Sequence, residues 1–284
     1  MAEFRIRPAR PEDTEPAYRL FADWQAAAFG EVEVGREMFT SALAGADASF
    51  VAETDDGLVG HAAVRGNGID VGVEPAERRR GVGTALLRAI EQAAKEEPLL
   101  LTGLSSEPAA AAFAAANGYV KAWEVWLMGV DLPTEVPSPE WPDGVEVRTF
   151  RADDAEVVKE LLDLAYAEEF HHHPVPFAQW RRFMLEDPMF DPEAWFLAVA
   201  GDEIVGAALN WDEGYIKDLV VHPAWRGRGL GKALMLQTFG EFARRGIPRV
   251  ALKTDSNNPT GAWRLYERVG MKTERTYEIY EKRR

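Results

Sequence analysis

A glycine-rich turn that begins with arginine occurs twice in the chain. The first copy runs from Arg78 to Thr84 as Arg-Arg-Arg-Gly-Val-Gly-Thr, and the second from Arg226 to Lys232 as Arg-Gly-Arg-Gly-Leu-Gly-Lys. Each copy follows a short apolar run and opens a stretch of helical periodicity. A strand that passes through such a turn into a helix directs backbone N–H groups toward an anion, and glycine permits its close approach. The pattern therefore predicts a phosphate-binding turn in a fold that is itself repeated.

The repeat extends over the whole chain. Arg7 corresponds to Arg148 at an offset of 141 residues, the turns correspond at 148, and Gly118 corresponds to Gly270 at 152. The order is kept while the offset grows slowly, so each repeat is a domain rather than a solenoid unit. Four prolines lie in the eleven residues 133–143. We therefore expect an N-terminal domain at residues 1–133, a semi-rigid linker at 134–143 and a C-terminal domain at 144–284.

Both halves show the same order of predicted elements: strand, helices, strand hairpin, strand, glycine turn, helix, strand, helix, strand. This order predicts an α+β fold, in which a twisted, mixed but mostly antiparallel sheet is flanked by helices. In the second half, a helix is expected at Leu230–Arg245, and another that starts at Asn258-Pro259 and ends at Gly270. Strands are expected there at Trp195–Ala200, Ile204–Trp211, Tyr215–Val221, Arg249–Thr254 and Lys272–Lys282.

Composition narrows the class of protein. The chain has no cysteine, which excludes thiolate nucleophiles, disulfides and cysteine-based zinc sites. The net charge of −15 argues against nucleic acid and anionic lipid as partners. There is neither a signal peptide nor an apolar run of about 18 residues, so we expect a cytoplasmic protein without membrane contact. The tract His171–His173 resembles a metal tract, but adjacent side chains point apart, and we expect no metal site.

Two common nucleotide motifs do not fit the second turn. A P-loop needs Gly-x-x-x-x-Gly-Lys-Ser/Thr, whereas Arg226 stands at its first position and Ala233 follows Lys232. A dinucleotide fingerprint needs Gly-x-Gly-x-x-Gly, which differs from the spacing of Gly227, Gly229 and Gly231. The turn is therefore expected to hold a pyrophosphate of another kind.

Residues Val220–Leu234 resemble the acetyl-CoA signature of the GNAT (GCN5-related N-acetyltransferase) family. The stretches Asp255–Pro259 and Leu265–Met271 are similar to that family's second motif, and Val71–Pro75 with Arg78–Thr84 resembles the first motif more loosely. The chain thus resembles the tandem, two-domain type of this family.

The resemblance implies acetyl-CoA as co-substrate. In the C-terminal domain it places the cofactor contacts on Leu219, Val220, Val221, Arg226, Gly227, Arg228, Gly229, Leu230, Gly231, Lys232 and Asn257. In the N-terminal domain the corresponding positions are Val73, Arg78, Arg80, Gly81, Val82, Gly83 and Thr84. The strand segment would pair with the pantetheine arm, and the turn amides would hold the pyrophosphate.

The resemblance also assigns catalytic roles. Tyr266 stands where the family's tyrosine protonates the leaving CoA thiolate. The base is open: we choose Glu213, with Asp212, Asp218 or a chain of waters as alternatives. Possible acceptor contacts lie in the segment 168–177 and are assigned to Glu169, Phe170 and His172.

The N-terminal copy has lost catalytic positions. Ala114 stands where Tyr266 does, and Ser105 where Asn257 does. We therefore expect a non-catalytic N-terminal domain and a C-terminal N-acetyltransferase that acts on a primary amine of a small molecule or a protein. The alternatives are a non-catalytic CoA-responsive binding module, or an acyltransferase for another acyl group or a hydroxyl acceptor. The chain is expected to be a monomer or a homodimer.

Overall fold

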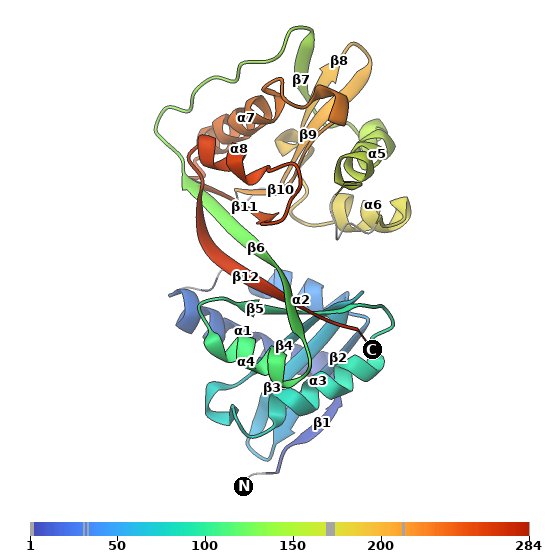
Figure 1. The fold of residues 1–284 in the computed structure, drawn as a ribbon, viewed down its shortest axis with the longest axis vertical. Coiled ribbons are helices and arrows are strands. Elements are labelled where there is room, and N and C mark those ends of the chain that lie inside the picture. Colours follow the sequence, from blue (N-terminus) through green and yellow to red (C-terminus); the bar gives the residue numbers. More distant parts are fainter. Residues whose placement is uncertain (1–2, 31, 33, 169–173, 212–213, 284) are drawn as a thin grey trace. The chain divides into compact units, whose positions relative to one another are not determined.

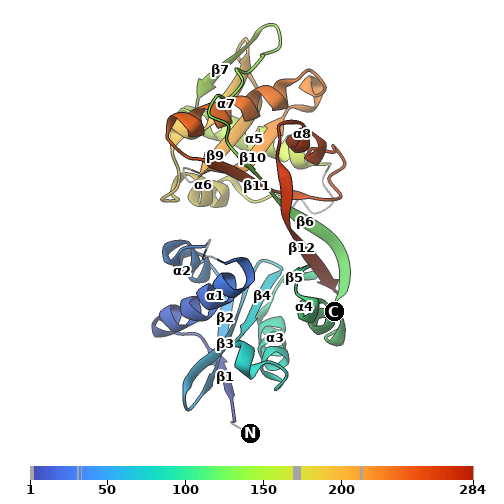
Figure 2. The same ribbon diagram turned by 90° about the vertical axis from the view of Figure 1, so that its left-hand side faces the viewer.

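The computed structural model describes the chain apart from residues 1–2, 31, 33, 169–173, 212–213 and 284. The chain forms two compact units, Met1–Trp123 together with Tyr277–Arg284, and Glu124–Thr276. Each unit is a sheet with helices packed on both of its faces (Figures 1 and 2). The predicted α+β class with a mixed sheet is confirmed. Within the described residues, no helix combines the length and the apolar character that crossing a membrane requires.

The first unit has six strands in the order β1-β2-β3-β4-β5-β12. Only β4 and β5 are parallel neighbours. The strands are β1 (Arg5–Pro8), β2 (Ala48–Thr54), β3 (Gly57–Arg65), β4 (Gly68–Val73), β5 (Leu99–Leu104) and part of β12 (Lys272–Lys282). The helices are α1 (Thr14–Phe29), α2 (Arg36–Ala44), α3 (Val82–Ala93) and α4 (Pro108–Ala116).

The second unit repeats this plan with the order β6-β11-β10-β9-β8-β7, and β10 and β11 are its parallel pair. Its strands are β6 (Val120–Asp131), β7 (Val145–Thr149), β8 (Phe196–Ala200), β9 (Glu203–Trp211), β10 (Tyr215–Val221) and β11 (Arg249–Asp255). Its helices are α5 (Ala155–Tyr166), α6 (Phe177–Leu185), α7 (Leu230–Arg244) and α8 (Trp263–Arg268).

The strand beside β5 comes from the second sequence repeat, and the strand beside β11 comes from the first. Residues Tyr277–Lys282 of β12 pair antiparallel with β5, so the end of the chain completes the first sheet. Residues Val125–Asp131 of β6 pair antiparallel with β11 and complete the second sheet. The Lys282 ammonium, 2.8 Å from the Glu91 carboxylate of α3, fastens the last strand to the first unit. The pattern of repeats, which predicts a boundary in the proline-rich segment 134–143, contains no sign of this exchange.

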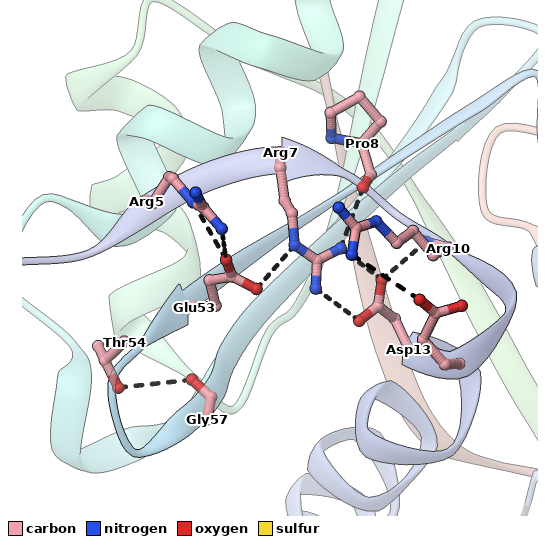
Figure 3. A network of polar contacts seen from close by, with 9 residues as sticks. Arg5, Arg7, Pro8, Arg10, Asp13, Glu53, Thr54 and Gly57 are labelled. Carbon is pink, nitrogen blue, oxygen red and sulfur yellow. Dashed lines mark hydrogen bonds and ion pairs between the residues drawn. The ribbon is translucent and has the colours of Figure 1, made fainter.

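The same polar clasp joins the first strand to the first helix in both units. In the first unit, the Arg7 guanidinium donates to both oxygens of Asp13 at 2.6 and 2.8 Å, and Asp13 also accepts the Arg10 backbone N–H at 2.7 Å (Figure 3). Hydrogen bonds from Arg7 lower the pKa of the Asp13 carboxyl. Arg7 also donates to Glu53 of β2 at 2.7 Å. The clasp fixes the direction in which α1 leaves the sheet.

In the second unit, the Arg148 guanidinium donates to Asp154 at 2.6 and 2.7 Å, and the Arg151 backbone N–H donates to Asp154 at 2.7 Å. Burial raises the pKa of Asp154, but the hydrogen bonds from Arg148 and Arg151 outweigh it, and the net shift is downward. The two repeats therefore share individual hydrogen bonds as well as the order of their elements.

The predicted elements of the second half are confirmed with one correction. The five expected strands and the helix after the turn are present within one or two residues. The last helix begins at Trp263, not at Asn258-Pro259. The reason is local: the Asn258 side chain accepts the Thr260 N–H at 2.9 Å, and Gly261 takes a left-handed φ of 65°, so the chain turns before the helix can start.

Candidate active site

The second sheet opens at a fork between its two parallel strands. The β10–β11 ladder consists of Tyr215↔Ala251 and Ile216↔Leu252, although β10 continues to Val221 and β11 to Asp255. On its other side, β10 stays paired with β9 as far as Val221↔Gly206. The segment Asp218–Val221, which we call the open edge of β10, thus turns one side of its backbone toward the fork. An extended ligand can pair with such an edge as a neighbouring strand does.

A β-bulge at Lys217 marks the start of the open edge. Ile216 pairs with Asn210 and Asp218 with Leu209, so Lys217 is the additional residue. Ile216 packs in the core beneath α7 and α8, whereas Val220 packs in the core beneath α5 and α6. In a regular strand these residues would share one face. The bulge therefore reverses the alternation and turns Asp218 toward the α5 side.

The glycine turn lies directly after β10. Gly227 and Gly229 have left-handed φ values of 75° and 87°, and a Cβ placed on either would have no atom within 4 Å. Gly229 is the N-cap of α7, so the first amides of this helix, including those of Leu230 and Gly231, have no partner within the helix. These amides and the positive helix end have the geometry that the predicted anion site requires. The open space over both glycines leaves room for a phosphate.

The cations of the turn are not equivalent. The Arg226 guanidinium donates to the Glu168 carboxylate at 2.7 Å and to the Ala165 carbonyl at 3.0 Å, so it holds the end of α5 against the turn. Arg228 lies over the Trp225 ring at 4.8 Å, and Lys232 is exposed on the first turn of α7. Arg228 and Lys232 are therefore the residues best placed to meet an anion, while Arg226 has a structural contact as well.

Tyr266 lies on α8 and is only 7% exposed. It packs in the same core as Ile216, the last residue of β10 before the fork, and as Met235 of α7. Its neighbour Leu265 lies 2.9 Å from where a Cβ on Gly231 would be, so α8 and the turn helix touch at the third glycine. The Asn257 N–H donates to the Asp255 carboxylate at 2.7 Å in the loop before α8, and the Asn257 side chain is exposed. The structure thus brings Tyr266, the turn and the open edge of β10 into one region of the second unit.

Sequence reasoning gave too little weight to one polar pair. The Tyr166 hydroxyl at the end of α5 donates to the Asp218 carboxylate at 2.8 Å. From sequence, Asp218 is only an alternative base, and Tyr166 has no predicted role. The bulge that turns Asp218 toward α5 shifts the register by one residue: Ile69 ends the parallel ladder of the first unit and Ile216 that of the second, at an offset one residue shorter than that of the turns. Four predicted residues, Glu213, Glu169, Phe170 and His172, lie outside the described residues.

The first unit has a similar fork without several of these features. Its β4–β5 ladder also has two pairs, ending at Ile69↔Leu101, but β4 pairs with β3 without a bulge. In its turn, Gly81 has a φ of 89°, and the other left-handed position is occupied by Arg79 at 65° rather than by glycine. The Arg80 guanidinium is paired with the Glu77 carboxylate at 2.6 Å.

The remaining predicted residues of this turn have the following places. Val73 ends β4, and the Arg78 side chain donates to the Val73 carbonyl at 3.3 Å. Val82, Gly83 and Thr84 form the first turn of α3, where a Cβ on Gly83 would come within 3.2 Å of Phe113. The first unit thus keeps the backbone shape of a phosphate turn, but the charge of Arg80 is neutralised by Glu77 within the turn.

Comparison with known proteins agrees with this geometry. The profile of the "Acetyltransferase (GNAT) family" matches residues 155–271, and that of the "Acetyltransferase (GNAT) domain" matches residues 45–121. A "Mycothiol acetyltransferase" of Nocardioides sp. is 34% identical over 224 residues, which cover 70% of this chain and 75% of that protein. The chain belongs to the GNAT acetyltransferase family. Its co-substrate is acetyl-CoA, as in other members, and its tandem order is similar to that of mycothiol synthase.

Solved GNAT structures resemble the chain over almost its full length. A GCN5-related N-acetyltransferase from Sphaerobacter thermophilus is 30% identical, with a TM-score of 0.82 over 98% of this chain and 95% of that one. A tandem GNAT protein from the clavulanic acid biosynthesis pathway is 20% identical, with a TM-score of 0.73 over 99% and 98%. The second likeness shows the shared tandem fold.

Proposed function

We propose that the second unit transfers the acetyl group of acetyl-CoA to a primary amine by direct attack in a ternary complex. The observation that carries this proposal is the open edge of β10, which leads directly into the glycine turn and lies beside the helix of Tyr266. An extended pantetheine arm fits the open edge, and a pyrophosphate fits the amides at the start of α7.

The chemistry needs three proton movements. The acceptor ammonium first loses a proton to water or to a base. The neutral nitrogen then attacks the thioester carbonyl carbon, and a backbone N–H near Leu219 stabilises the oxygen that becomes negative. The C–S bond breaks as the nitrogen gives up a second proton to solvent and Tyr266 gives its proton to the departing thiolate. A phenol suits this role because its reference pKa of about 10 is close to that of a thiol. With no cysteine in the chain, a direct transfer is preferred to a thioester-linked enzyme intermediate.

The acceptor is proposed to be a small amine. Relatives with 34% identity are mycothiol acetyltransferases, which favours a small-molecule acceptor over a protein. We propose that the first unit does not catalyse transfer, because Ala114 occupies the place of Tyr266 and Ser105 that of Asn257. The cytoplasm is its proposed location.

Calorimetric titration with acetyl-CoA, combined with mass spectrometry of a primary-amine panel, tests this function. We expect one binding site per chain and a product that is heavier by one acetyl group on nitrogen. Two sites would show that the first turn also binds the cofactor. No binding, or binding without any acetylated amine, would contradict the proposed transfer.

A further inference from the structure

Asp218 is a largely covered carboxylate at the fork. It is the first residue of the open edge of β10, and its side chain is 13% exposed. The bulge at Lys217 turns it toward α5, where Val220, the next residue on the same face, packs against Leu162 and Ala165. Placing a carboxylate in such a position costs free energy unless it is paired or hydrogen-bonded. Its environment therefore shows what kind of group it is suited to bind.

The contacts of Asp218 leave capacity for a ligand. One oxygen accepts the Tyr166 hydroxyl at 2.8 Å. The other lies 3.5 Å from the Lys217 ammonium, which is too long for a strong charge-assisted hydrogen bond. Because an ionised carboxylate offers about four lone-pair positions, these contacts do not saturate it. The oxygen that is not held by Tyr166 has remaining capacity to accept from a cationic donor.

The first unit lacks this arrangement. Its corresponding carboxylate, Asp70, is exposed on β4. The residue that corresponds to Tyr166 is Gln25, at the offset of 141 that relates the two clasps, and its side-chain oxygen accepts the Val34 backbone N–H at 3.0 Å. The largely covered carboxylate with a tyrosine donor thus belongs to the unit that keeps Tyr266.

We propose that Asp218 binds the ammonium group of the acceptor, and that Tyr166 is a positioning residue that orients the carboxylate. This inference rests on the proposed function of the second unit and adds that the acceptor is a cation when it binds. The ammonium donates to Asp218 on the α5 side of the fork, while acetyl-CoA occupies the open edge. Amines that are positively charged at neutral pH are then preferred over neutral molecules of the same shape.

The test compares variants of the full chain in the presence of saturating CoA. Glucosamine, spermidine and phenethylamine are titrated by calorimetry, with glucose as the counterpart of glucosamine that lacks the amine. At least one amine is expected to bind while glucose does not. Asp218→Asn should weaken that binding about tenfold or more, and Tyr166→Phe about threefold, as expected for the loss of charged and neutral hydrogen bonds. In turnover with the same amine, KM rises and kcat stays within about twofold.

The matched control is Asp163→Asn. Asp163 lies one turn before Tyr166 on α5, and its carboxylate pairs with Lys159. The substitution should leave amine binding unchanged. The proposal is overturned if no amine binds, if glucose binds as well as glucosamine, if the control weakens binding equally, or if Asp218→Asn lowers kcat with KM unchanged. Should Asp218→Asn fail to fold, Tyr166→Phe, which keeps the carboxylate, tests the proposal instead. A rise in KM supports it, and an unchanged KM contradicts it. Loss of CoA binding by the unaltered chain would instead contradict the proposed function.

Discussion

The two forks of this chain have the same backbone plan and different side chains. In the second unit, the end of α5 carries Ala165, whose carbonyl accepts from the turn residue Arg226. In the first unit, the corresponding residue is Trp24, whose indole N–H donates to the Glu107 carboxylate at the start of α4 at 2.9 Å. Glu107 corresponds to Pro259, which cannot accept through its side chain. The two units thus share the sheet and the turn, whereas in the first unit the residues around the fork bond to one another.

Charge differs between the forks in the same way. The helix α8 presents the exposed residues Arg264 and Arg268, whereas α4 is almost entirely alanine. Arg80 of the first turn pairs with Glu77, while Lys232 of the second turn is exposed near the helix start. Because the two turns share their backbone geometry, any difference in anion binding between them must come from the neighbouring side chains.

The sharpest way to break this comparison is to block each turn in the same manner. Gly229 and Gly81 have φ values of 87° and 89°, and a Cβ on either meets no atom within 4 Å. A tryptophan at either position therefore carries the same backbone strain. Gly229→Trp should abolish acetyl-CoA binding in calorimetry, and Gly81→Trp should leave the affinity and stoichiometry unchanged. If Gly81→Trp removes a binding site, the first fork is in use.

The next effect concerns Tyr266, the proposed acid. Tyr266→Phe keeps the buried ring but removes the acid, and should lower kcat by about 100-fold, as losses of general acids do. Acetyl-CoA affinity should change little, because the hydroxyl acts on the leaving group. Stopped-assay kinetics and calorimetry measure the two quantities. The control is Ala114→Ser, a substitution at the corresponding position of the first unit, which should leave kcat unaltered. An unchanged kcat in Tyr266→Phe would show that Tyr266 is not the acid.

The clasps allow a stability comparison. Asp154→Asn should destabilise the chain by about 2 kcal/mol, since hydrogen bonds to charged groups contribute about 1.5–3 kcal/mol. Asp13→Asn should cost less, because Arg7 keeps its ion pair with Glu53 (Figure 3), whereas Arg148 has no second carboxylate partner among the described residues. Urea unfolding at neutral pH measures both free energies of unfolding. A larger loss for Asp13→Asn would mean that burial, not partner number, decides the value of the clasp.

The smallest effect is a pH dependence confined to the first unit. Burial lowers the pKa of His61 to about 4, and its Nδ1 is buried with no hydrogen-bond partner in the described part of the chain. Because the folded pKa lies below the unfolded value, the unfolded chain binds the proton first. Stability is thus fully present above pH 6.5 and is lost as the pH falls from 6.5 toward 4.

Between pH 7.5 and 5.5, this one group should cost about 1.4 kcal/mol of the free energy of unfolding. Its cross-strand partner is Gly72, and the corresponding pair in the second unit is Ala207 and Val220, which do not titrate. The measurement is urea unfolding at both pH values for the unaltered chain and for His61→Ala. The pH-dependent loss should be smaller in the variant by that amount, and equal losses would show that His61 does not contribute.

Much of the fold was predictable from local sequence. The glycine turns, the apolar periodicity of α7 and the extents of β9 and β10 are set by neighbouring residues, and the structure confirms them. The predicted start of α8 at Pro259 lies four residues before the observed start at Trp263, because Asn258 forms a turn through its own side chain and Pro259 alone suggests a helix start. Side-chain turns of this kind compete with helix formation and are hard to weigh without coordinates.

By itself, the sequence determined the duplication, the α+β class and the place of the two glycine turns, because glycine spacing and hydrophobic period act over a few residues. Only the tertiary structure decided that Tyr277–Lys282 completes the first sheet and that Val125–Asp131 completes the second. It also decided that Arg226 holds α5 and that Tyr166 meets Asp218. These contacts join residues 52 to more than 170 positions apart, and such pairings depend on sheet order and on one bulge rather than on local propensity.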